Sequence, residues 1–98
     1  MWEKRPCVYI LCDHYKGALY TGVTADLIRR IHQHRNGEEG GFTARYGIKR
    51  LVWYEWHPDM KTAIKWEKRI KRWSRARKYW IIETMNPKWE DLYETRLT

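Results

Sequence analysis

The stretch that most constrains this chain is residues 7–34, which has the pattern of two β-strands running directly into a helix. Residues 8–12 and 18–23 carry the side chains typical of strands, and residues 13–17 between them favour a turn. Neighbouring strands joined by so short a turn pair antiparallel. The sequence therefore predicts a β-hairpin followed by a helix.

The register of this hairpin decides which side chains share a face. If a four-residue loop places Cys12 opposite Gly17, then Tyr9 lies opposite Tyr20. Side chains alternate along a strand, so both phenols then point to the same face of the sheet. Two cross-strand tyrosines alone are ordinary packing, and a chemical role for them depends on what else lies nearby.

A helix is expected immediately after the second strand. Thr24 or Asp26 can cap its N-terminus, and residues 27–35 form its body. Arg30 and His34 are four residues apart, so they lie one turn apart on the same side of this helix. His34 taken alone fits a solvated helix residue as well as a catalytic one.

The rest of the chain continues with alternating strand and helix signals. The expected elements are a glycine-rich loop at 36–41, a turn at 42–47, a third strand at 51–56, a helix from Asp59 to about Trp73, and a helix from Ser74 that ends before Asn86. Together they predict an α/β (α+β) fold, in which a small three-stranded antiparallel sheet is flanked by helices. A chain of 98 residues fits one domain, so we expect a single domain over residues 1–98.

One position in the helix after Asp59 interrupts its amphipathic pattern. The predicted apolar stripe consists of Met60, Ala63, Ile64, Ile70 and Trp73. Glu67 lies in the middle of that stripe, where a carboxylate is costly unless it is paired or bound to a metal. Two interpretations stay open: Glu67 is a metal ligand, or it forms a structural ion pair with Arg30 or another base.

The charge of the chain favours an anionic partner. Lys plus Arg number 20 against 12 Asp plus Glu, a formal charge of +8. Nucleic acid is the commonest such partner, and an acidic membrane surface is the lesser alternative. The candidate nucleic-acid contacts are Lys65, Lys68, Arg69, Lys71, Arg72 and Arg75. Such a run also fits a solvated helix face. Trp2 and Trp89 are candidate platforms for base stacking if they are exposed.

Several other classes of protein are disfavoured. No apolar stretch approaches the roughly 18 residues that span a bilayer, so we expect a cytoplasmic protein with no membrane partner. Cys7 and Cys12 point to opposite faces of one strand, which argues against a mutual disulfide, and their spacing is not that of a zinc site. No P-loop is present, and Ser74, the only serine, lies outside any nucleophile-elbow sequence.

The residue types that remain suit cleavage of a phosphodiester. A phenol or imidazole can accept a proton from the attacking water, a guanidinium can neutralise charge on the phosphate, and a carboxylate can hold a hard divalent cation. The two tyrosines, Arg30, His34 and Glu67 supply each of these groups.

The order and spacing of these residues resembles the GIY-YIG endonuclease family. Tyr9 stands in the first motif, Tyr20 and Gly22 in the second, Arg30 follows eight residues after Gly22, and Glu67 lies in a later helix. The resemblance covers nearly the whole chain. The chain is similar to the small bacterial stand-alone members of the family.

The resemblance implies a mechanism and a cofactor. It implies that Glu67 binds one divalent metal, Mg²⁺ or Mn²⁺, and that Tyr9 activates the attacking water. It further implies that Tyr20 and His34 assist and that Arg30 steadies the phosphate.

Two hypotheses about function follow. The leading one is a metal-dependent endonuclease that hydrolyses DNA phosphodiester bonds with low sequence specificity, in repair or recombination. The alternative is a non-catalytic nucleic-acid-binding module that retains the fold, and RNA is an alternative partner for either. Val23 stands where several relatives carry lysine or another polar residue, so one auxiliary phosphate contact is missing from the pattern.

Overall fold

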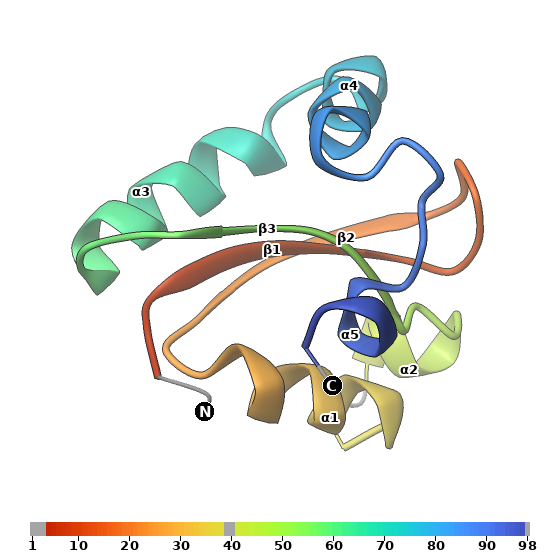
Figure 1. Cartoon of the computed structure of the whole chain (residues 1–98), viewed down its shortest axis with the longest axis horizontal. Helices are drawn as coiled ribbons and strands as arrows, with labels where there is room; N and C mark the ends of the chain where they lie inside the picture. The colour runs from red at the N-terminus through yellow and green to blue at the C-terminus, as the bar shows by residue number, and fades with distance from the viewer. Residues whose placement is uncertain (1–3, 39–40, 98) are drawn as a thin grey trace.

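A three-stranded antiparallel sheet with helices on both faces forms the framework of the protein (Figure 1). The structure is a computed structural model and describes residues 4–38 and 41–97. The elements are β1 (Cys7–Cys12), β2 (Leu19–Thr24), α1 (Leu27–Arg35), α2 (Gly41–Arg45), β3 (Arg50–Trp56), α3 (Met60–Lys71), α4 (Arg75–Met85) and α5 (Leu92–Thr95). The strand order β2-β1-β3 places β1 in the centre. This architecture confirms the predicted fold class.

The hairpin pairs in a register two residues away from the predicted one. Tyr9 lies opposite Gly22 and Tyr20 lies opposite Leu11, so the prediction that Tyr9 faces Tyr20 directly is wrong. A shift of two residues preserves the alternation of side chains, and the two tyrosines still share one face.

The hairpin loop explains this shift. Asp13 Oδ1 accepts hydrogen bonds from the backbone N–H groups of His14 and Ala18, each at 2.8 Å. These bonds close a loop over residues 13–18 in place of the four-residue loop expected, and Cys12 consequently pairs with Leu19.

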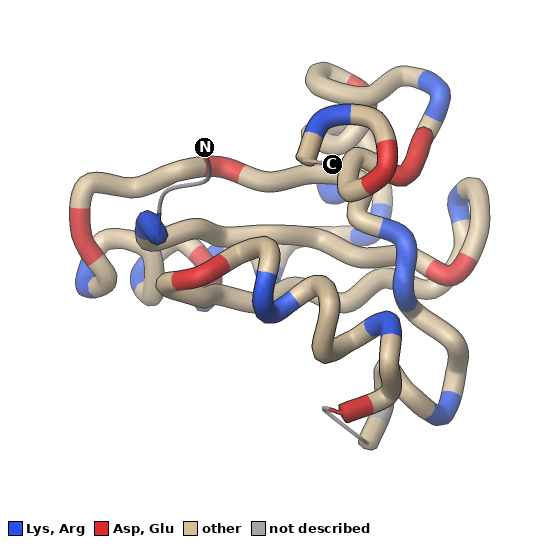
Figure 2. The backbone as a smooth tube through the Cα atoms, turned by 60° about the horizontal axis from the view of Figure 1, so that its bottom comes forward, with Lys and Arg blue, Asp and Glu red and all other residues tan. Residues whose placement is uncertain are grey.

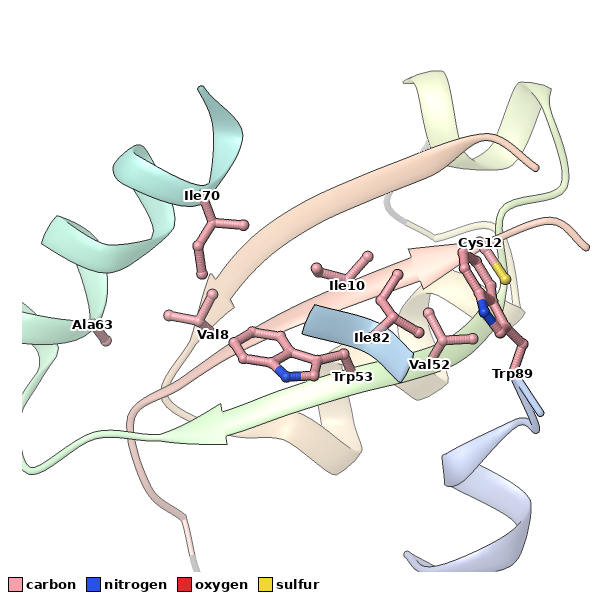
Figure 3. Close-up of a cluster of buried hydrophobic side chains, with 9 residues drawn as sticks. All are labelled: Val8, Ile10, Cys12, Val52, Trp53, Ala63, Ile70, Ile82 and Trp89. Carbon is pink, nitrogen blue, oxygen red and sulfur yellow. The ribbon is translucent and has the colours of Figure 1, made fainter. Parts of the chain in front are cut away.

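Each face of the sheet has its own hydrophobic core. Helices α3 and α4 cover one face, and α1, α2 and α5 cover the other (Figure 1). The core under α3 and α4 contains Val8, Ile10, Cys12, Val52, Trp53, Ala63, Ile70, Ile82 and Trp89 (Figure 3). The core on the α1 side contains Cys7, Tyr9, Leu11, Leu27, Ile31, Ile48, Leu51 and Leu92. The two cysteines are thus free, buried and on opposite faces, as predicted.

The helices begin where their capping residues predict. The side chains of Asp26, Asp59 and Ser74 accept backbone N–H bonds at the first turns of α1, α3 and α4. The ends differ more, since α3 stops at Lys71 and the segment expected as a turn contains α2.

Ile64 corrects the predicted apolar stripe of α3. Its side chain is exposed, whereas Ala63, Glu67 and Ile70 are buried. Ile64 lies about 100° around the helix from Ala63, which turns it away from the sheet.

Lys and Arg are spread along the whole backbone and are not confined to one segment (Figure 2). Among the described residues, no helix is long and apolar enough to cross a membrane.

Candidate active site

Tyr9 extends from the central strand over its edge neighbour. A Cβ atom added at Gly22 would lie 2.4 Å from both Cζ and Oη of Tyr9, a distance that real atoms do not tolerate. Glycine at this position therefore lets the phenol rest directly on the backbone of β2. Since β2 is an edge strand, the Tyr9 hydroxyl is carried to the rim of the sheet.

A chain of three buried polar side chains begins at that hydroxyl. Tyr9 Oη lies 3.0 Å from His34 Nε2, and His34 Nδ1 lies 3.1 Å from Thr43 Oγ1. Tyr9, His34 and Thr43 are 0%, 2% and 4% exposed. If Nδ1–H donates to Thr43, Nε2 is the acceptor of the Tyr9 O–H; the other tautomer reverses both bonds.

Local structure explains how these groups meet. The Asp26 cap fixes the start of α1, so that Leu27, Ile31 and His34 face inward from one side of the helix. Helix α2 then brings Thr43 against the far nitrogen of the imidazole. Thr43 has no motif of its own, and the sequence offered no signal that could have identified it.

Tyr20 completes an aromatic cluster around the imidazole. Its ring centroid lies 5.4 Å from that of His34 and 6.3 Å from that of Tyr9, and the Tyr9 and His34 rings are 5.8 Å apart. Tyr20 is half-buried, so it is the phenol nearer to solvent.

Arg30 lies one turn before His34 on α1 and is partly buried. Together with Thr24, Ala25, Asp26, Arg29 and Gln33 it lines a cleft of about 310 Å³ at the start of the helix. Arg29 itself is exposed. A guanidinium that lines a cleft one helical turn from His34 is placed to meet an anionic group.

Glu67 belongs to the other layer of the molecule. Its side chain lies on the sheet-facing side of α3, between Ala63 and Ile70, and the residue is 7% exposed. Lys71 Nζ approaches Glu67 Oε2 to 2.6 Å. The structural partner of this carboxylate is thus Lys71. Helix α3 packs on β1 and on the edge strand β2, so Glu67 and Tyr9 approach the rim from opposite faces.

The GIY-YIG catalytic domain profile matches residues 5–80 of this sequence. The chain belongs to the GIY-YIG family. This is a superfamily of nucleases, and the match includes every candidate catalytic and metal residue named above.

Two bacterial relatives extend this likeness. UPF0213 protein BH0048 of Halalkalibacterium halodurans is 34% identical over 84 residues, covering 86% of this chain and 88% of the relative. A UPF0213 protein of Bacillus pumilus is 32% identical over 92 residues and covers 94% of each chain. The solution NMR structure of UPF0213 protein BH0048 from Bacillus halodurans superimposes with a TM-score of 0.56 at 32% identity, over 96% of this chain and 99% of that one.

GIY-YIG nucleases generally use divalent metal ions, and Glu67 fits such an ion. The described residues contain no group of three or more His, Cys, Asp or Glu side chains that could hold a metal. Mg²⁺ does not require one, because it is commonly bound through one or two carboxylates, with water and substrate phosphate completing its shell. Lys71 contacts Oε2, which leaves Oε1 of the buried carboxylate as a donor.

The six candidate nucleic-acid contacts of this GIY-YIG chain fall into three groups. Lys65, Lys68, Arg69 and Arg72 line a pocket of about 220 Å³ on the outer side of α3. Lys71 pairs with Glu67. Arg75 donates hydrogen bonds of 3.1 Å to the Gly17 carbonyl and to Tyr79 Oη, which ties α4 to the hairpin loop.

Trp89 is not a stacking platform. It is fully buried in the core under α3 and α4, and its Nε1–H donates to Glu83 Oε2 at 2.8 Å. The other candidate, Trp2, lies outside the described residues.

Proposed function

We propose that this chain is a metal-dependent endonuclease that hydrolyses DNA phosphodiester bonds with low sequence specificity. We further propose that it acts in the cytoplasm as one domain, in repair or recombination. The observation that carries the proposal is the buried hydrogen-bonded chain Tyr9–His34–Thr43, which ends at the rim of the sheet.

In this proposal Tyr9 and His34 move protons. The attacking water gives a proton to Tyr9 Oη as its oxygen bonds to phosphorus, and Tyr9 passes its own proton to His34 Nε2. The P–O bond to the leaving oxygen of the phosphodiester breaks in the same displacement, and that oxygen takes up a proton from solvent water. Thr43 holds the imidazole in the tautomer whose Nε2 is free to accept. A base oriented by a third group in this way is the usual means of activating a weak nucleophile.

Arg30, Tyr20 and Glu67 have the supporting roles. Arg30 binds the scissile phosphate in the cleft at the start of α1, where its planar guanidinium can pair with two phosphate oxygens. Tyr20 confines the imidazole and the reacting groups. Glu67 holds Mg²⁺ or Mn²⁺, and the ion, when bound, neutralises charge that develops on the phosphate oxygens.

A second function, a nucleic-acid-binding module without catalysis, is favoured by one feature of the site. Both key groups already have protein contacts, since Tyr9 is fully buried against His34 and Glu67 is paired with Lys71. A protein that only binds DNA or RNA would have no need to release either group.

Incubation with supercoiled plasmid separates the two functions. An endonuclease converts the plasmid to nicked circles with Mg²⁺ or Mn²⁺ and stops when EDTA is added. A binding module retards the plasmid in a gel and leaves it supercoiled with either metal, which would refute the proposal. Parallel incubations with RNA and single-stranded DNA determine the substrate class.

A further inference from the structure

Tryptophan and arginine alternate in sequence from α3 through the turn into α4. The five residues are Trp66, Arg69, Trp73, Arg77 and Trp80. Trp66 and Arg69 lie three residues apart on α3, Trp73 lies between the helices, and Arg77 and Trp80 lie three residues apart on α4. The Arg69 guanidinium lies 5.0 Å from the centroid of the Trp66 ring, and that of Arg77 lies 4.1 Å from the Trp73 ring. We call these five residues the Trp–Arg stripe.

The last member of the stripe differs from the others. Trp66 and Trp73 are half-buried and pack against the core under α3 and α4. Trp80 is 63% exposed, more than any other large hydrophobic side chain of the described residues. Arg77 lies one turn before Trp80, so an exposed indole and a stacked guanidinium adjoin each other on α4.

The surroundings of the stripe are basic. The pocket lined by Lys65, Lys68, Arg69 and Arg72 lies beside it on α3. Glu67 is the one acidic residue between positions 65 and 80, and its carboxylate is turned toward the sheet and paired with Lys71. The surface therefore combines positive charge with an accessible aromatic face.

We propose that the outer surface of α3 and α4 binds single-stranded nucleic acid, with Trp80 stacked on an unpaired base and the neighbouring Lys and Arg side chains on the phosphates. Stacking platforms set in a basic groove are the general means of binding single strands. A duplex cannot use Trp80 in this way, because its bases are stacked on one another. A membrane surface is a poorer fit, since Ile82 of α4 is turned into the core and α4 lacks a continuous apolar face toward solvent.

This inference rests on the proposed function and narrows its substrate. The Trp–Arg stripe belongs to the α3 and α4 layer, and the Tyr9–His34–Thr43 chain belongs to the opposite layer. Helix α4 packs on β3 and α3 packs on β2, so a strand that runs from Trp80 to the Tyr9 rim would pass over α3 and then the edge strand β2. The preferred substrate then has an unpaired stretch next to the bond that is cut.

Fluorescence anisotropy in EDTA tests the platform without cleavage. The probes are a labelled oligothymidylate and a labelled hairpin duplex, and the proteins are the wild type, Trp80→Ala, Trp80→Phe and the control Tyr46→Ala. Tyr46 is also exposed, at 54%, but lies after α2 on the other layer. Trp80→Ala is expected to weaken oligothymidylate binding by about 5- to 150-fold, the range for loss of one stacked base. Trp80→Phe is expected to retain part of the affinity, and Tyr46→Ala to bind as the wild type does.

The duplex separates stacking from general attraction. Trp80→Ala should change duplex affinity by less than about twofold. Unchanged oligothymidylate binding by Trp80→Ala, or an equal loss of affinity for both probes, would overturn the inference. The inference would also be overturned if Trp80→Ala changed the sedimentation of the protein or its binding to lipid vesicles and left oligothymidylate binding unchanged. Plasmid nicking tests the proposed function separately. If the wild type nicks plasmid and Trp80→Ala binds oligothymidylate normally, only the stacking role of Trp80 is refuted. If the wild type never nicks plasmid, the proposed nuclease activity is refuted.

Discussion

Gly22 is the residue that sets the position of the Tyr9 hydroxyl. A methyl group at Gly22 would overlap three atoms of the Tyr9 phenol, of which the nearest two, Cζ and Oη, are at 2.4 Å. The ring is buried between β2 and α1, so it can yield only by displacing its neighbours. We predict that Gly22→Ala lowers the free energy of unfolding by about 1–3 kcal/mol, as overpacked cores generally do. Urea denaturation measures this, and an unchanged midpoint would show that Tyr9 does not rest on β2.

Glu67 offers a second test at the scale of one residue. Its partner Lys71 is half-exposed and remains hydrated without the carboxylate, so Glu67→Gln should change the stability of the metal-free protein by less than about 1 kcal/mol. The same change should abolish any rise in melting temperature produced by Mg²⁺, because the ligand charge is lost.

Thermal melts with and without Mg²⁺ check this prediction. Glu94→Gln is the matched control, because Glu94 also pairs with a basic residue, Arg35, at 2.8 Å. Glu94 lies on α5, far from α3 in the sequence. It should leave the response to Mg²⁺ intact. A loss of about 3 kcal/mol or more in metal-free Glu67→Gln would instead show that the fold depends on the ion pair with Lys71, and would contradict the role of Glu67 as a metal ligand.

At the scale of elements, Asp91 joins three parts of the α1 layer. Its Oδ1 accepts from the backbone N–H of Leu51 in β3 at 3.3 Å and from that of Tyr93 in α5 at 3.1 Å. Its Oδ2 accepts from Arg35 of α1 at 2.6 Å, and this bond is the main cause of the raised pKa of Arg35. We predict that Asp91→Ala lowers the free energy of unfolding by about 2–3 kcal/mol, through loss of a cap and of a charge-assisted bond.

Asp59→Ala is the control for Asp91. Asp59 caps α3 through the Thr62 N–H at 2.7 Å and joins no other element. In urea denaturation, Asp59→Ala should lower the free energy of unfolding distinctly less than Asp91→Ala does. Equal losses would mean that Asp91 acts only as a cap.

The elements show which parts of the structure a sequence can reveal. The starts of α1, α3 and α4 were predictable, because a capping side chain and its N–H partner lie within three residues of each other. The hairpin register was not predictable from the sequence. It depends on the hydrogen bond from the Ala18 N–H to the Asp13 carboxylate, which strand propensity does not predict.

The candidate site shows the same division. The shared face of Tyr9 and Tyr20 follows from the alternation of strand side chains, and the alignment of Arg30 with His34 follows from helical periodicity. The contact between His34 and Thr43 depends on how α2 folds back after the glycine-rich segment, which is a tertiary arrangement. The pairing of Glu67 with Lys71 was one of several ion pairs that the sequence allowed.

At the scale of the whole molecule, both cores depend on the central strand β1. Its alternate residues enter opposite cores, and Cys7 and Cys12 each mark one of them. Burial raises the pKa of both thiols from 9.0 to about 12.

These thiols make stability depend on alkaline pH. Above about pH 9 the unfolded chain releases thiol protons that the folded chain retains, so the unfolded state binds fewer protons and stability falls as pH rises toward 12. Below pH 9 the thiol contribution is fully present. We predict that urea midpoints fall more steeply between pH 8 and pH 10 for the wild type than for Cys12→Ala, which lacks one such group. Parallel slopes would contradict the burial of Cys12 as a neutral thiol.

The central claim is that Tyr9, from one layer, and Glu67, from the other, act together at the β2 edge of the sheet to cleave DNA. Tyr9→Phe tests this claim most directly. This change removes one hydroxyl from the chain to His34 and leaves the packed ring, with Tyr46→Phe as a control at an exposed tyrosine. The measurement is the single-turnover rate of plasmid nicking in Mg²⁺, with DNA affinity measured alongside. We predict that Tyr9→Phe binds DNA as the wild type does and nicks it about a hundredfold more slowly or worse, the usual effect of losing a general base. Nicking by Tyr9→Phe at the wild-type rate would contradict the account.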